Sequence, residues 1–95
     1  MSLRVERNER TITVISDDKN AENALLGEAL SAAAPQLLPA FDEAPFENGE
    51  LRLDVGYEDW GSLLEALEAM DSDNPGVTGE CVDQVDGWQR ELDAA

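Results

Sequence analysis

The chain has 95 residues, of which 42% are hydrophobic, and it carries 22 acidic residues against six basic ones, a formal net charge of −16. This length predicts one domain over residues 1–95, with enough hydrophobic residues for a single folded core. The charge excludes DNA, RNA and anionic membranes as direct ligands, because a field of this sign repels them.

The start of the chain predicts a β-hairpin. Leu3 and Val5 alternate with charged residues, and Ile12 and Val14 alternate with threonines, which is the period-two pattern of half-buried strands. The polar segment between them contains Asn8, a residue that tolerates the positive φ of a tight turn. We therefore expect two antiparallel strands joined by a short polar turn.

Leucines and alanines at helical spacing predict a helix next, from about Lys19 to Ala34, capped by the acidic segment before it. Pro35 and Pro39 then interrupt the helical pattern, so the following segment is expected to be irregular or to form a single turn. The Asn-Gly pair at 48–49 predicts a turn.

The strongest pattern follows this turn. From Glu50 to Val55 charged and apolar residues alternate, which predicts a strand with one buried face. After Gly56 the apolar residues recur at helical spacing, which predicts an amphipathic helix to about residue 71. The buried stripe of that helix is expected to contain Trp60, Leu63, Leu64, Leu67 and Met70.

The polar run 71–76 predicts a loop, after which a last helix is predicted from Thr78 or Gly79 to about Leu92. Its buried stripe is expected to contain Cys81, Val85, Trp88 and Leu92. The element order is therefore ββα-βαα. We expect a two-layer α+β fold in which three helices cover one face of a three-stranded, mainly antiparallel sheet.

The sequence contains no recognisable catalytic or cofactor motif. It has no histidine, which excludes Ser-His and Cys-His nucleophile pairs and histidine-ligated zinc. Cys81 falls on an apolar stripe beside acidic residues, which favours a buried structural thiol over a catalytic one. Residues 71–76 partly match the start of a calcium-binding loop, but Pro75 and Val82 stand where ligands are needed. We therefore expect no enzyme activity, no metal site and no cofactor.

The acidic residues predict a binding surface for a basic partner. Carboxylates three or four residues apart on a helix lie about 5 to 6 Å apart, so two neighbouring helices present parallel rows of negative charge. A groove lined by arginine and lysine for a nucleic acid would accept such rows, with an affinity that falls steeply in salt. The candidate partner-binding residues are Glu58, Glu65 and Glu68 in one row and Asp83, Asp86 and Asp93 in the other.

In its size, its charge and its acidic helical faces, the whole chain resembles the small acidic inhibitors made by phages and mobile elements, among them several anti-CRISPR proteins. The resemblance implies a DNA mimic that blocks the DNA-binding channel of a Cas surveillance complex, a bacterial defence complex. It also implies a viral protein that acts in the cytoplasm of the host cell.

Two other interpretations of the charge stay open. The first is salt adaptation of an unrelated small domain from a halophilic organism, which the single lysine fits, because acids then replace lysines over the whole surface. The second is an antitoxin-like interaction module that binds a basic protein through the exposed edge of the hairpin. A cytoplasmic location is expected in each case. The chain has one cysteine, no secretory signal pattern and no apolar run near the roughly 18 residues that span a bilayer.

Overall fold

The computed structural model describes residues 3–17, 22–76, 78 and 80–94. Over this part of the chain the strands are β1 (Arg4–Asn8), β2 (Thr11–Asp17), β3 (Phe46–Glu47) and β4 (Glu50–Gly56). The α-helices are α1 (Glu22–Ala33), α2 (Leu38–Glu43), α3 (Trp60–Asp73) and α4 (Cys81–Asp93). Two 3-10 helices, η2 (Pro35–Leu37) and η3 (Tyr57–Asp59), precede α2 and α3.

The described strands form one antiparallel sheet in the order β1-β2-β4-β3, which confirms the α+β class but adds a strand to the expected three. The predicted hairpin of β1 and β2 is present. Its residue with positive φ is Glu9, at 57°, and not Asn8. Asn8 ends β1 opposite Thr11, so residues 9 and 10 alone form the turn.

The additional strand, β3, pairs with the start of β4 through a tight hairpin. Asn48 and Gly49 take φ values of 55° and 80°, as a two-residue hairpin turn with positive φ at both positions requires. The predicted turn is thus confirmed. A strand of only Phe46 and Glu47 is too short for an alternating pattern, which is why the sequence did not indicate it.

The structure also contains a helix, α2, that the predicted element order lacks. Pro35 and Pro39 lie in the first turns of η2 and α2, where a proline has no intrahelical N–H bond to lose. Pro35 follows the end of α1 at Ala33 and begins η2, and Pro39 lies in the first turn of α2. The cap predicted for α1, together with residues 18–21, lies outside the described residues.

The loop between the last two helices begins later in the chain than predicted. Helix α3 extends to Asp73, because the amide of Asn74 still bonds to the Met70 carbonyl oxygen at 2.8 Å. Helix α4 begins at Cys81, after the predicted start. Thr78 does not begin a helix; it is buried, and its hydroxyl donates to a carboxylate oxygen of Asp71 at 3.0 Å. No helix of the described residues is long and apolar enough to cross a bilayer.

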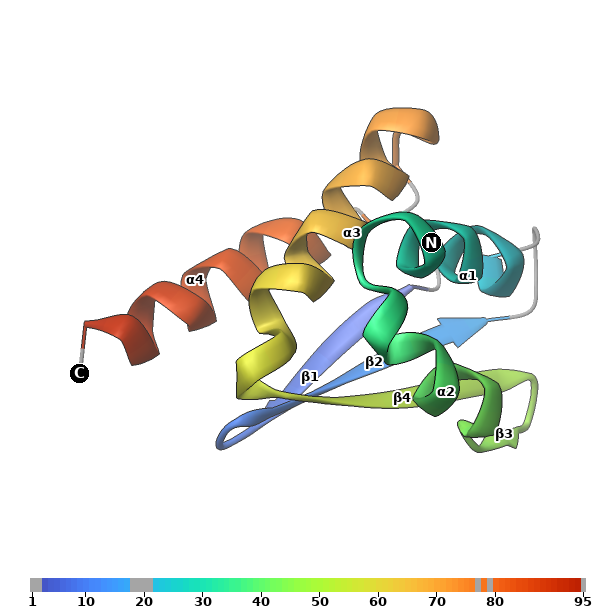
Figure 1. Ribbon diagram of the computed structural model, residues 1–95, viewed down its shortest axis with the longest axis horizontal. Coiled ribbons are helices and arrows are strands. Elements are labelled where there is room, and N and C mark those ends of the chain that lie inside the picture. Colours follow the sequence, from blue (N-terminus) through green and yellow to red (C-terminus); the bar gives the residue numbers. More distant parts are fainter. Residues whose placement is uncertain (1–2, 18–21, 77, 79, 95) are drawn as a thin grey trace.

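Helices α1, α3 and α4 lie on one face of the sheet, which gives two layers (Figure 1). The sheet residues buried against them are the alternate apolar residues of three strands: Leu3, Val5, Ile12, Val14, Leu51, Leu53 and Val55. Helix α3 buries Trp60, whose indole N–H donates to the Val55 carbonyl oxygen at 3.1 Å. On α4 Val85 is buried, whereas Trp88 and Leu92 are only half-buried, since that end of the helix extends past the sheet (Figure 1).

The opposite face of the sheet is polar with one exception. Ile15 is fully buried there, outside the core cluster. Arg4 and Arg52 lie directly beside it on the two neighbouring strands. Glu50 forms salt bridges to both guanidinium groups, at 2.9 Å and 3.6 Å. The hydrocarbon stems of the two arginines therefore shield Ile15, while their charged ends stay in water.

Candidate anionic interface

The charge of the molecule is distributed unequally between its two layers. Residues 57–94, which form η3, α3 and α4, contain eleven carboxylates and one arginine, a balance of −10. The strand segments 3–17, 46–47 and 50–56 contain six acids and four arginines, a balance of −2. None of the eleven carboxylate side chains is buried. The helical side of the molecule is therefore strongly anionic, and the sheet side is nearly neutral.

The arginines near the acidic helices are already engaged. Arg7 of β1 forms a salt bridge to Glu91 of α4 at 3.2 Å, and its guanidinium carbon lies 5.9 Å from the centre of the Trp60 ring. Arg10 lies over the Tyr57 ring, 5.1 Å from its centre. The salt bridge joins β1 to the C-terminal half of α4, and the two ring contacts join the hairpin to α3 and η3. They leave both arginines near aromatic rings, where a cation is favourably placed.

Three of the predicted interface residues are open to a partner. Glu65 and Glu68 are exposed on α3, and Asp83 is exposed on α4; within the described residues none of them forms a salt bridge. Glu58 is exposed too, but it belongs to η3 and not to α3. A methyl group at Gly56 would meet its carboxylate oxygens at 3.1 Å, so Glu58 is turned back toward that backbone. The first predicted row thus consists of Glu65 and Glu68, with Glu58 set apart.

The other two predicted residues have partners of their own. Asp86 is half-buried and forms a salt bridge to Arg90, one helical turn later, at 3.1 Å. Asp93 accepts a hydrogen bond from the Tyr57 hydroxyl. This hydrogen bond raises the pKa of Tyr57 above its usual value of 10.0, and the charge of Asp93 adds to the effect while that of Arg10 opposes it.

Sequence reasoning overlooked part of the anionic surface. Five further carboxylates of the same segment were not among the candidate residues: Asp59, Asp71, Asp73, Glu80 and Glu91. A signal for them exists in the sequence, because only one arginine and no lysine follow residue 52. Counting charge by predicted element would have separated the acidic helices from the balanced strands.

The residues that could bind a metal or act as a nucleophile lie in ordinary structural positions. Among the described residues no group of three or more potential metal ligands comes together. Asp71 and Asp73, considered as the start of a calcium loop, lie in α3 instead. Cys81 is buried and donates its S–H to the Leu3 carbonyl oxygen at 3.4 Å. What the arrangement can do is attract cations to the exposed carboxylates of η3, α3 and α4.

Comparison of the chain with protein-family models, with curated proteins and with solved structures found no match.

Proposed function

We propose that the protein is an acidic inhibitor that binds the basic nucleic-acid groove of another protein through its anionic helices, as a mimic of DNA. The observation that carries the proposal is the unequal distribution of charge, −10 on residues 57–94 with η3, α3 and α4 against −2 on the strand segments. A cationic groove built for phosphates accepts such a surface by electrostatic complementarity. The target class that we favour is the DNA-binding channel of a Cas surveillance complex.

The same distribution argues against salt adaptation as the full explanation. Adaptation to molar salt replaces basic residues over the whole surface, whereas here the strands and the β1-β2 turn keep four arginines in contacts with acids or aromatic rings. The two interpretations also differ in the salt concentration that the protein needs in order to fold. A DNA mimic is folded at about 0.15 M salt, while a halophilic domain needs screening of its carboxylates before it folds. A salt titration followed by circular dichroism separates them, and folding only near molar salt would reject the mimic.

Binding is tested with a guide-loaded Cas surveillance complex and a fluorescein-labelled target duplex, followed by fluorescence anisotropy. We expect the protein to displace the duplex at 0.15 M salt and to lose potency steeply as salt rises. The variant Glu65→Gln, Glu68→Gln, Asp83→Asn preserves shape and deletes three charges that form no salt bridge within the described part of the chain. It should weaken displacement by about tenfold or more, because charge at the contact contributes most.

A matched variant removes the same number of charges elsewhere. Asp42, Glu43 and Glu47 are exposed on α2 and β3, so Asp42→Asn, Glu43→Gln, Glu47→Gln gives the same net charge. It should retain most of the displacement. Equal losses from both triple variants would mean that a diffuse field and not the helical surface acts, and would contradict the proposed interface.

A further inference from the structure

The exposed edge of β1 carries backbone groups that no described strand uses. β1 is the first strand of the sheet and pairs only with β2. Asn8 and Thr11 close a two-residue turn and so form a hydrogen-bonded pair, and such pairs alternate along an antiparallel ladder. Arg4 and Glu6 therefore bond to β2, while the N–H and C=O of Val5 and Arg7 point away from it.

The contact of Cys81 agrees with this alternation. Leu3 belongs to the outward set, and its carbonyl oxygen accepts the Cys81 S–H from the first turn of α4. Helix α4 thus reaches the outer edge of β1 at its N-terminal end. Among the described residues, the outward N–H and C=O of Val5 make no backbone hydrogen bond.

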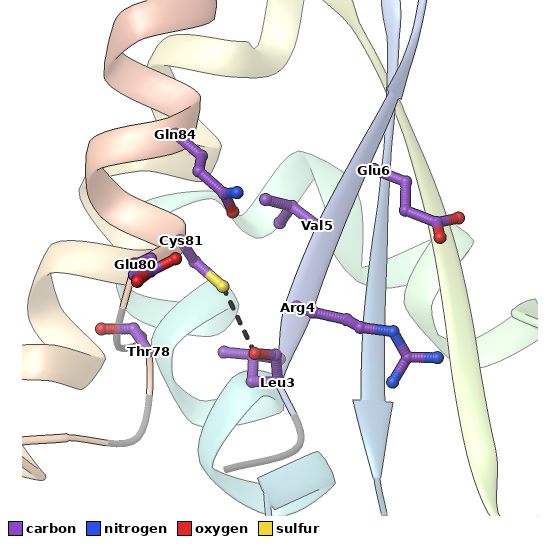
Figure 2. A pocket seen from close by; sticks show the side chains of 8 residues that line it. All are labelled: Leu3, Arg4, Val5, Glu6, Thr78, Glu80, Cys81 and Gln84. Atoms are coloured by element: carbon purple, nitrogen blue, oxygen red, sulfur yellow. Dashed lines mark hydrogen bonds between the residues drawn. The ribbon is translucent and has the colours of Figure 1, made fainter.

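A groove runs between this edge and α4 (Figure 2). Its volume is about 530 Å³, and its apolar lining comes from Leu3, Val5 and Cys81. Figure 2 shows Val5 directed toward Gln84, whereas Arg4 and Glu6 project to the other face of β1. A chain segment lying beside β1 would have one set of alternate side chains in the groove and the other set beside Arg4 and Glu6.

We propose that the β1 edge binds an extended, cationic segment of a partner protein as an added antiparallel strand. Strand addition supplies backbone hydrogen bonds from the edge and selects alternate side chains through the groove. Leu3, Val5 and Cys81 belong to the core and expose only a small apolar strip along the groove, on which one alternate set of side chains would rest. Basic side chains are favoured on the rim, because Arg4 is already bonded to Glu50 while Glu6 and Glu80 are exposed in a molecule of charge −16.

A second copy of the chain fits this edge less well. If two β1 edges paired, the acidic helix α4 of each copy would lie close to that of the other, since α4 reaches the β1 edge at Cys81. Two molecules of charge −16 also repel one another. The proposed surface combines the β1 edge with the start of α4, where Asp83 also lies, whereas Glu65 and Glu68 lie on α3. It goes beyond the DNA-mimic proposal because it uses the backbone hydrogen bonds of β1, and these are tested separately from the acidic side chains.

The probe is the peptide acetyl-Lys-Val-Lys-Val-Lys-Val-Lys-amide, titrated into ¹⁵N-labelled protein and followed by NMR. We expect saturable shifts of the Leu3–Arg7 amides and of Gln84, with a dissociation constant below about 1 mM. Methylation of the central valine nitrogen should weaken binding by about tenfold or more, because that N–H faces Val5 in the proposed register. Methylation of a neighbouring lysine nitrogen, which faces away from β1, is the matched control and should change binding less than about twofold.

The protein offers a second test in Glu6, which is exposed and forms no salt bridge within the described chain. Glu6→Lys should weaken binding of the lysine peptide and strengthen binding of its glutamate analogue. Equal losses from both methylated peptides, or shifts confined to α3, would overturn strand addition. Shifts of the β1 amides on dilution of the protein alone would identify a second copy as the occupant and would overturn it as well. Either result leaves the test with the Glu65, Glu68 and Asp83 variant unaffected.

Discussion

The proposed interface predicts that removal of acids stabilises the fold while it weakens binding. Glu65 and Glu68 lie three residues apart on the exposed face of α3, and within the described residues neither has a cationic partner. Two like charges at this spacing on a helix destabilise it by about 0.2–0.5 kcal/mol. The perturbation is therefore a cycle of Glu65→Gln, Glu68→Gln and the double variant, in which the coupling energy isolates the pair from the effect of each single change.

We expect a coupling of about 0.2–0.5 kcal/mol in 10 mM salt, where the Debye length is about 30 Å. With a urea m-value of about 1–3 kcal/mol/M, this corresponds to a shift of the midpoint by about 0.07–0.5 M. The assay is urea unfolding followed by circular dichroism, repeated in 1 M salt. There the Debye length is about 3 Å and the coupling should vanish.

The same double variant should bind the basic partner less tightly than the unchanged protein. A gain in stability together with a loss of binding is expected if the paired charges serve recognition, because selection for stability alone would not retain them. A coupling of zero in 10 mM salt, or one that stabilises the pair, would refute the reasoning. It would mean that the two carboxylates do not repel one another across the α3 surface.

Three further predictions concern Tyr57, Trp60 and Val85, which lie in the same helical segments as the acidic residues. Tyr57 is the only tyrosine of the chain, so its ionisation can be followed by absorbance at alkaline pH. The midpoint should lie above pH 10.0 and fall in Asp93→Asn. Because the folded pKa is raised, the contribution of Tyr57 to stability should be complete below pH 10 and be lost as pH rises through the Tyr57 pKa, whereas an unshifted midpoint would exclude the hydrogen bond. Trp60→Phe removes the donor to the Val55 carbonyl and part of the core, and should cost about 1–3 kcal/mol in urea unfolding; a loss below 0.5 would indicate that the indole N–H finds no buried partner. Val85→Ala should destabilise by about 1–3 kcal/mol, since Val85 is fully buried on α4, and an unchanged midpoint would mean that α4 does not pack on the core.

The sequence predicted those parts of the fold in which a pattern extends over several residues. Alternation from Glu50 to Val55 covers six positions and identified β4, and helical spacing identified α3 and α4. Strand β3 has two residues and no pattern of its own. Ile15 could not be placed either, because its burial depends on Arg4 and Arg52 from strands far apart in the sequence.

The candidate site shows the same limit. The pairing of Asp86 with Arg90 follows from helical spacing alone, since the two residues are four apart. The pairing of Tyr57 with Asp93 joins residues 36 apart and depends on how α4 lies against η3. Local spacing therefore locates acidic faces, whereas the tertiary contacts decide which carboxylates remain unpaired and able to meet a cation.

Because negative charge is concentrated in one layer, the molecule has a permanent electric dipole that runs from the sheet to the helices. In the field of the proposed cationic channel this dipole would experience a torque, which would turn the helices toward the channel before the two surfaces touch. Fewer encounters then occur in the wrong orientation. A charge layout of this kind raises the rate of association, and it does so without any added contact in the final complex.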